Sequence, residues 1–236
     1  FQNCAILEAV TIGSGLNAIS QHMFENCKQL KTVNFNEESN ITRIGAWAFD
    51  SCIVLQNIQL PNSVISIEDN AFRQCVTLES VALPNGLKNI GEDAFIDCHV
   101  LANIAIPNTV ESIEDRAFVR CYALPSINIP NNDSFDTIDF QVFYECISLT
   151  TVTIPDNVTT IGIGAFQGCS NLATVTIPSS VTSIGSSAFY NCSNLTSVVS
   201  LRDPAPTLDA SNPNFTFGNT HISITLTVPF NAQGYT

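Results

Sequence analysis

Nine cysteines recur along this chain at almost constant intervals. They occupy positions 4, 27, 52, 75, 98, 121, 146, 169 and 192, so successive cysteines are 23 residues apart or, in two cases, 25. A Phe lies three residues before every cysteine, and a Leu lies three residues after it. Self-similarity at a fixed period of this length is typical of solenoids, propellers and other repeat arrays. The period therefore constrains the fold more than any single motif does.

The repeated unit reads L-x-x-I-x-I-P-x-x-V-x-x-I-G-x-x-A-F-x-x-C. Leu101–Cys121 carries it with Glu in place of the Gly, and Leu172–Cys192 carries it with Val at one Ile position. The two longer units each gain two residues at the same place, directly after the I-x-I segment, at 36–40 and 130–134. Both insertions therefore interrupt an otherwise uniform array at one side of the unit.

Each part of the unit predicts a local structure. The alternation of apolar and polar residues in I-x-I indicates a short strand, which the following Pro ends because it has no N–H to donate. V-x-x-I predicts a second extended or turning segment. A-F-x-x-C spans one helical turn, which is too short for an independent helix. We expect an α/β solenoid in which strands alternate with short helical or 3-10 turns.

A single unit cannot fold alone. Burial of its roughly seven inward side chains yields about 10–20 kcal/mol. Ordering a backbone of 23 residues costs about 1–2 kcal/mol per residue, which is more. Stacking the units as parallel coils covers both flat sides of each unit and adds hydrogen bonds between coils.

The same stacking explains the cysteines. Equivalent residues of neighbouring coils lie about 4.8 Å apart and point the same way. A disulfide needs Cβ atoms about 3.5–4.5 Å apart with converging bonds. We therefore expect buried, reduced thiols that act as small apolar side chains rather than redox or metal ligands.

The whole unit, as in Leu101–Cys121 and Leu172–Cys192, resembles the BspA-like leucine-rich repeat over about residues 1–200. The resemblance is specific because ordinary leucine-rich repeats do not share the A-F-x-x-C half. The resemblance implies a right-handed superhelix of about nine coils with a parallel β-sheet on the concave face. It also implies a surface protein of anaerobic bacteria or parasitic protozoa that adheres to host or partner macromolecules.

The ends of the chain depart from the pattern. We assign 1–198 to the solenoid and 199–236 to a C-terminal capping segment with an edge strand at 222–229. Phe1 already occupies the Phe position of a unit, so we expect further repeats or another domain upstream. The apolar residues of that first unit, Phe1, Cys4 and Leu7, predict end-to-end association of the isolated chain.

Charge excludes two classes of partner. Lys and Arg total 8 against 21 Asp and Glu, for a net charge of -13. Nucleic acids and anionic membranes both need a basic face, so neither is expected to bind. The sequence also has no run of about 18 apolar residues, so we expect no direct insertion into a membrane.

We find no arrangement of residues that predicts catalysis or a cofactor. His22, His99 and His221 are scattered without a carboxylate or cysteine at ligand spacing. Gly162–Gly168 only faintly resembles a phosphate-binding loop, and its glycines fall at ordinary unit positions. We therefore expect no enzyme activity and no cofactor.

Acidic residues recur just before the A-F turn, at Glu68-Asp69, Glu92-Asp93, Glu114-Asp115 and Asp139. They favour the capping of exposed N–H groups at the turn. Calcium binding along the resulting acidic ridge is the alternative, since hard cations take convergent oxygens.

The candidate interaction surface consists of outward strand positions and the two insertions. The strand positions are Asn34, Asn57, Gln59, Asn103, Asn128, Thr151, Thr153, Thr174 and Thr176, and the insertions contribute Glu38 and Asp133. These short polar side chains include no aromatic anchor, although protein hot spots favour Trp, Tyr and Arg. A merely solvated sheet is therefore the competing interpretation of this face.

Our first hypothesis is a non-enzymatic binding module of a cell-surface or secreted adhesion protein. It would bind a protein or glycan on a host or neighbouring cell through an extended face. The alternative is a cytoplasmic scaffold of the same fold, which the reduced thiols also favour.

Overall fold

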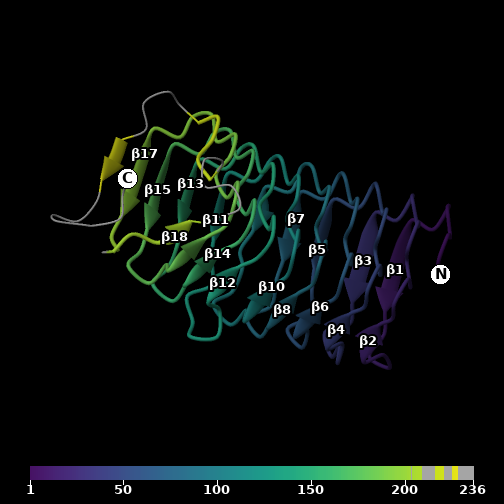
Figure 1. The fold of residues 1–236 in the computed structure, drawn as a ribbon. Helices are drawn as coiled ribbons and strands as arrows, with labels where there is room; N and C mark the ends of the chain where they lie inside the picture. Colours follow the sequence, from purple (N-terminus) through teal and green to yellow (C-terminus); the bar gives the residue numbers. More distant parts are fainter. Residues whose placement is uncertain (203, 209–215, 221–224, 228–236) are drawn as a thin grey trace.

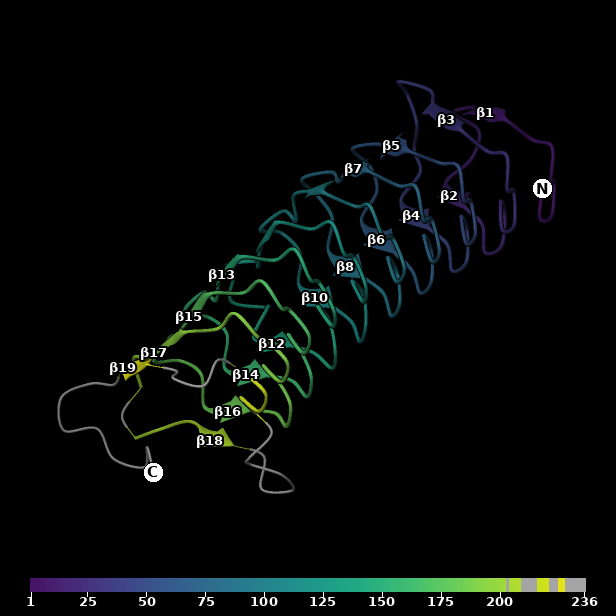
Figure 2. The ribbon, with the colours of Figure 1, turned by 90° about the horizontal axis from the view of Figure 1, so that it is seen from above.

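The chain winds into a solenoid with one coil per repeat (Figure 1). This computed structural model describes residues 1–202, 204–208, 216–220 and 225–227. Each full coil contributes two short strands, and all strand pairs are parallel and join neighbouring coils. Seen from above, the two sets of strands run along different sides of the stack (Figure 2). The predicted parallel solenoid is therefore confirmed.

The odd-numbered strands up to β17, together with β19, form what we call the first-strand sheet, which corresponds to the I-x-I segments. Its members are β1 (Ala9–Ile12), β3 (Thr32–Phe35), β5 (Asn57–Gln59), β7 (Ser80–Ala82), β9 (Asn103–Ile104), β11 (Ser126–Asn128), β13 (Thr151–Thr153), β15 (Thr174–Ile177), β17 (Ser197–Ser200) and β19 (Thr225–Thr227).

The even-numbered strands form the second-strand sheet. They are β2 (Ala18–Ile19), β4 (Arg43–Ile44), β6 (Ser66–Ile67), β8 (Asn89–Ile90), β10 (Ser112–Ile113), β12 (Thr137–Ile138), β14 (Thr160–Ile161), β16 (Ser183–Ile184) and β18 (Thr207–Leu208). That the first-strand sheet lies on the concave side of a right-handed superhelix stays a prediction.

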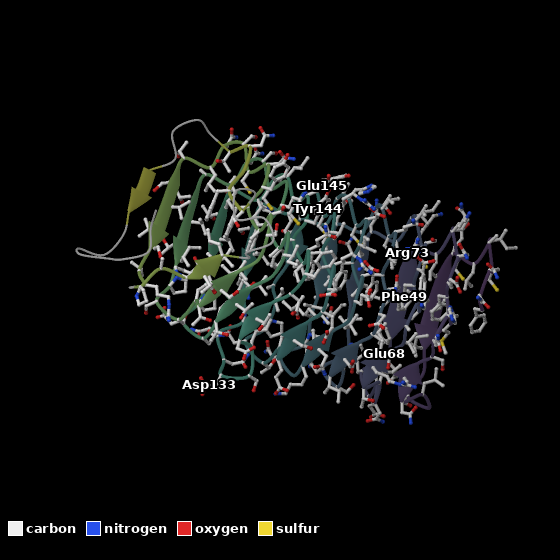
Figure 3. All side chains as sticks on the ribbon, in the orientation of Figure 1. Phe49, Glu68, Arg73, Asp133, Tyr144 and Glu145 are labelled. Atoms are coloured by element: carbon white, nitrogen blue, oxygen red, sulfur yellow. The ribbon has the colours of Figure 1, made fainter. Side chains whose placement is uncertain are left out.

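The core consists of continuous columns of equivalent side chains. The Phe column runs from Phe1 to Phe217 with ring centroids 5.2–5.7 Å apart and ring planes within 16° of parallel. Phe49, one of its fully buried members, is labelled in Figure 3. Such large aromatic side chains supply much of the apolar area that each coil buries. The stacking that the period predicted is thus present in the interior.

The cysteine column is reduced, as predicted, and has a role that the sequence did not reveal. The thiol of each cysteine from Cys27 to Cys192 donates to the backbone carbonyl of a Phe in the preceding coil, at 3.1–3.3 Å. A cysteine at this position therefore fills apolar space and also gives the Phe carbonyl a second donor, beside the backbone N–H of the cysteine in that carbonyl's own turn.

The A-F-x-x-C segments are not helical. Among the described residues no α-helix or 3-10 helix occurs, so the helical or 3-10 turns of the prediction are not confirmed. The residue two before the Phe and the residue one before the Cys take the left-handed conformation instead, such as Trp47 at φ 59° and Ser51 at φ 59°. Their N–H groups donate to the next coil, at Asp69 and Arg73. A right-handed helix would keep these bonds within the segment, so stacking between coils overrides local helix formation.

The described part of 199–236 continues the ladders. β18 pairs with β16, β19 pairs with β17, and the Phe217 ring stacks on Phe189 at 5.2 Å. Of the edge strand predicted at 222–229, Thr225–Thr227 forms β19, and the other positions lie outside the described residues. The division at residue 198 and the capping role stay predictions.

The first-strand sheet is interrupted twice. Its hydrogen-bonded groups are β1-β3, then β5-β7-β9, then β11 through β19. The first interruption, between β3 and β5, adjoins the coil with the insertion at 36–40. The second lies between β9 and β11, in front of the coil with the insertion at 130–134. The candidate site is therefore expected at one of these two interruptions.

Candidate ligand groove

All nine predicted strand positions lie on the exposed side of the first-strand sheet. Where the sheet is intact they form neighbouring rows, as in the pairing of Thr151 with Thr174 and of Thr153 with Thr176. A flat row of short hydroxyls offers a ligand little enclosure. A binding site is therefore expected where the first-strand sheet is interrupted and these rows of outward side chains end.

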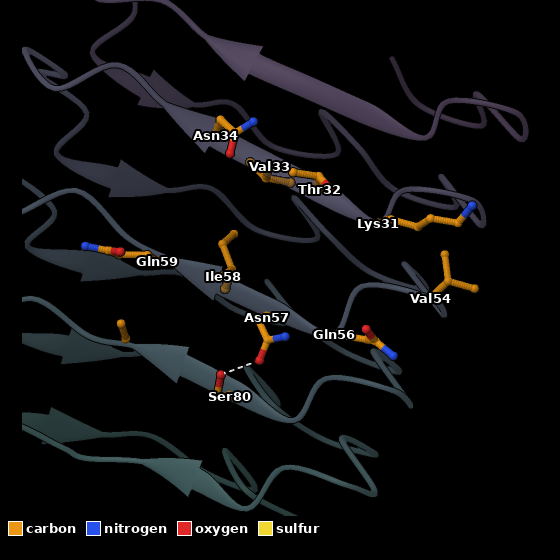
Figure 4. Close-up of a pocket in the computed structure, with 11 residues that line it drawn as sticks. Lys31, Thr32, Val33, Asn34, Val54, Gln56, Asn57, Ile58, Gln59 and Ser80 are labelled. Atoms are coloured by element: carbon orange, nitrogen blue, oxygen red, sulfur yellow. Dashed lines mark hydrogen bonds between the residues drawn. The ribbon is translucent and has the colours of Figure 1, made fainter.

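The first interruption changes the flat exposed face of the sheet more than the second one does. Between β3 and β5 lies a depression of about 830 Å³, whose polar lining includes Lys31, Asn34, Gln56, Asn57 and Gln59 (Figure 4). Val33 and Ile58 form its floor and are 7% and 3% exposed. We call this depression the ligand groove.

The groove continues toward the first insertion. A second depression of about 580 Å³ shares Asn34 and Gln59 with it and extends over Asn36, Glu37 and Ser39. Three of the predicted strand residues, Asn34, Asn57 and Gln59, are thus brought together with the first insertion. Glu38 lies in the same insertion, where its backbone N–H donates to the Asn36 Oδ1 at 2.9 Å, but it does not line the groove.

The amide side chains of the groove are mostly free. Within the described residues, the side chains of Asn34, Gln56 and Gln59 make no hydrogen bond, whereas the Asn57 Oδ1 accepts one from the Ser80 hydroxyl at 2.5 Å. Each free amide offers a planar donor and acceptor to a ligand. The backbone edges of β3 and β5 that face each other also lack ladder partners.

The Lys31 ammonium at the rim of the groove is not free to bind a ligand, because it pairs with a carboxylate of the preceding coil. It lies 3.0 Å from the Glu8 Oε2 of the preceding coil. Both side chains are more than half exposed, so the pair contributes little to stability. It nevertheless neutralises the one charge that lines the main depression.

The second interruption is bridged at Ile106 by a side chain, although a depression of about 530 Å³ remains beside Asn103 and Pro125. Pro125 occupies the position whose N–H donates to the preceding coil elsewhere, as in Thr150 to Pro125 and Ala173 to Thr150. Asn128 bridges the resulting gap, because its Oδ1 accepts from the Ile106 N–H at 3.1 Å and its Nδ2 donates to the Ile106 carbonyl. Asn128 is therefore occupied within the chain, unlike Asn34 at the same position of its unit.

The other predicted residues do not join the groove. Asn103 is exposed on β9, and Asp133 lies at the lower border of the molecule in Figure 3. The second insertion is fixed by Asn132, whose Nδ2 donates to the carbonyls of Asn108 and Val110 at 2.8 and 2.7 Å. The two insertions, which the sequence ranked equally, thus differ: only the first extends a groove.

Three of the acidic residues before the A-F turns bind backbone N–H groups of neighbouring coils, whereas Glu92 and Asp93 bind the Arg116 guanidinium. The Glu68 Oε2 accepts from Ala46 at 3.0 Å, the Asp69 Oδ1 from Glu92 at 3.0 Å, and the Asp115 Oδ1 from Phe140 at 3.1 Å. Their partners therefore belong to adjacent coils and not to their own turn, as simple capping would have it. No group of three or more His, Cys, Asp or Glu side chains suited to a metal ion occurs among the described residues.

Asp139 is the exception in this acidic row. Its partial burial raises the pKa of its carboxyl to about 6, and the nearby carboxylates of Glu114, Asp115 and Asp136 add to the shift. Like charges at this site disfavour the ionised form. Asp139 therefore lowers the stability of the coil at neutral pH.

Among the described residues, neither the thiols nor the histidines form a nucleophile with its base. Burial raises the pKa of the Cys146 and Cys192 thiols to about 12, so they remain protonated and unreactive. The His99 ring stacks on Tyr122 at 4.9 Å and lies 3.5 Å from the Asp97 carboxylate, on the exposed side of the turns. His221 lies outside the described residues.

The turns carry a second surface that the strand-based prediction missed. The Arg73 guanidinium lies 5.2 Å from the Trp47 ring centroid, and Arg120 binds Asp97 at 2.5 and 3.0 Å. Tyr144 and Glu145 extend it toward the upper border in Figure 3. The signal lay in the positions before the cysteines, since Arg73 and Tyr144 lie two residues before one and Asp97, Arg120 and Glu145 lie one residue before one.

Comparison with known families agrees with this architecture. The profile of the BspA type leucine rich repeat region matches the chain in six copies, over residues 1–124 and 88–210. The chain belongs to this family. A search of curated proteins finds no match.

Solved structures of leucine-rich repeat proteins resemble the fold. A T. pallidum leucine rich repeat protein is 30% identical, with a TM-score of 0.64 over 70% of this chain and 77% of its own. The pneumococcal vaccine antigen PcpA is 19% identical, with a TM-score of 0.50 over 95% and 68% of the two chains. A leucine rich cell surface protein of Faecalibacterium prausnitzii is 23% identical, with a TM-score of 0.49 over 95% and 80%.

The described residues include no helix that is long and apolar enough to span a membrane.

Proposed function

We propose that this chain is a non-enzymatic recognition module and that the ligand groove is its contact surface. The observation that carries the proposal is the open interruption between β3 and β5, where free amide side chains and unpaired strand edges meet in one depression. A leucine-rich repeat fold suits such a module because its stacked coils hold an extended face rigid.

We further propose that the parent protein is displayed at the cell surface or secreted, where it adheres to a host or neighbouring cell. The family resemblance supports this location. In adhesion, weak contacts from several displayed copies add by avidity, so a shallow groove is sufficient. A cytoplasmic scaffold that binds another protein through the same groove is the alternative.

Two measurements test these proposals. Beads coated with the chain should adhere to cultured epithelial cells, and the double variant Asn34→Ala/Gln59→Ala should lose at least about tenfold in adherence. The matched double variant Thr151→Ala/Thr174→Ala, on the same sheet outside the groove, should adhere as the wild type does. Equal behaviour of the two double variants would reject the groove as the contact surface.

Location is tested on the source organism. An antibody against the chain should label intact cells or the culture medium. Labelling that appears only after cell lysis would contradict surface display and favour the scaffold.

A further inference from the structure

The open interruption is too narrow for an added peptide strand. A third strand between β3 and β5 would need about 9.5 Å between them, twice the usual strand spacing. The same two coils are held closer elsewhere, because the rings of Phe24 and Phe49 stack at 5.4 Å and β4 pairs with β6. The facing backbone groups are therefore accessible to small donors and acceptors but not to a whole strand.

The groove is also the wrong site for an anionic or an apolar ligand. The one charged residue that lines the main depression is Lys31, and Glu8 neutralises it. The net charge of -13 repels anionic chains. Val33 and Ile58 are almost completely covered, so the floor offers little apolar surface to a hydrophobic ligand.

The remaining chemistry fits hydroxyl groups. A hydroxyl both donates and accepts, and a side-chain amide presents a donor and an acceptor in one plane. Asn34, Gln56 and Gln59 supply three such amides without internal partners, around a depression of about 830 Å³. Neighbouring hydroxyls of a sugar ring can satisfy one amide at both ends.

We propose that the ligand groove binds a neutral carbohydrate chain, an inference that rests on the groove being the contact surface of the module. Sugar hydroxyls bond to the amides of Asn34, Gln56 and Gln59 and reach the unpaired edges of β3 and β5. The main depression has no aromatic ring for stacking, so each site binds weakly, with a dissociation constant on the order of millimolar.

The test is a titration of the whole chain with neutral hexasaccharides of glucose, mannose and N-acetylglucosamine, followed by heteronuclear NMR. At least one should shift the amide resonances of Asn34, Gln56 and Gln59, with a roughly tenfold loss of affinity in Asn34→Ala/Gln59→Ala. Thr151→Ala/Thr174→Ala is the control and should bind as the wild type does. An anionic heparin hexasaccharide should bind more weakly than the neutral ones.

Three results would overturn the inference. They are no shift with any of the three neutral hexasaccharides up to about 20 mM, tighter binding of the heparin hexasaccharide, or an equal effect of the two double variants. Adherence that depends on Asn34 and Gln59 but survives enzymatic removal of cell-surface glycans would also reject carbohydrate, while leaving the proposed recognition module intact.

Discussion

The first-strand sheet is interrupted at two places. The two interruptions differ in whether a side chain forms hydrogen bonds across the gap. Between β9 and β11 a backbone donor is missing at Pro125, and the Asn128 side chain supplies two bonds across the gap by holding both polar groups of Ile106. Between β3 and β5 the equivalent position holds Gln59, which makes no such bond. One interruption is therefore repaired from within the chain, and the other leaves its polar groups to solvent or to a ligand.

The difference teaches that a polar residue at an outward strand position can be either structural or available. Exposure alone does not separate the two, since Asn128 and Gln59 are both exposed. Their hydrogen-bond partners do separate them. Four substitutions test this distinction.

The largest effect is expected from a third interruption made in the intact sheet. Ala173→Pro removes the N–H that donates to the Thr150 carbonyl, and no side chain nearby is placed to repair the loss. We expect a loss of about 3 kcal/mol in the free energy of unfolding, measured by urea denaturation. Ala173→Ser is the control, and a similar loss there would show that side-chain size and not the missing donor is responsible.

The second largest effect is expected from removing the side chain that bonds across the interruption between β9 and β11. Asn128→Ala leaves the N–H and carbonyl of Ile106 without their partner, so we expect a loss of about 2 kcal/mol in the free energy of unfolding. Gln59→Ala, at the same position of its unit, should change it by less than about 0.5 kcal/mol. Equal losses in the two variants would contradict the distinction between a sealed and an open interruption.

A pH-dependent effect is expected in the acidic row before the A-F turns. The pKa of Asp139 is raised to about 6 in the folded chain, above the usual carboxyl value, so its ionisation opposes folding. Asp139→Asn should raise the free energy of unfolding by about 1 kcal/mol at pH 7.5, after allowance for partial exposure. The gain should fade as the pH drops from about 6 to 4. A gain that persists at pH 4 would rule out charge as its cause.

The smallest effect would come from sealing the open interruption. Gln59→Asn places an amide of the same length as Asn128 opposite the Phe35 backbone. We expect a gain of up to about 1 kcal/mol in unfolding free energy, together with weaker binding of any ligand in the groove. Gln59→Asp is the control because it accepts but cannot donate. A gain in Gln59→Asp as large as in Gln59→Asn would show that no two-ended bridge forms.

Much of the solenoid was predictable because its core repeats in the sequence. The Phe, Cys and Leu columns, the parallel strands and the reduced thiols all follow from one period. The left-handed turns do not, since residues as different as Trp47, Asp93 and Arg116 take the same positive φ. The bonds between stacked turns impose that conformation, although Asn, Asp and Gly, which adopt it most readily, hold several of these positions.

The candidate site was predictable only in part. The sequence identified Asn34, Asn57 and Gln59 and the first insertion, and the structure brings them into one groove. It ranked Asn128 and Asp133 equally with them, because the bonds between Asn128 and Ile106 depend on a residue of the preceding coil. Pro125 was a readable signal for a missing donor, whereas its repair required the three-dimensional register.

The central claim, that one interruption is open and the other sealed, is tested most directly by amide hydrogen exchange followed by NMR. The Ile106 N–H, bonded to the Asn128 side chain at 3.1 Å, should exchange slowly. The Asn57 N–H, whose strand has no partner on the β3 side, should exchange at least about a hundredfold faster. Equal protection of the two amides in the free chain would contradict the account.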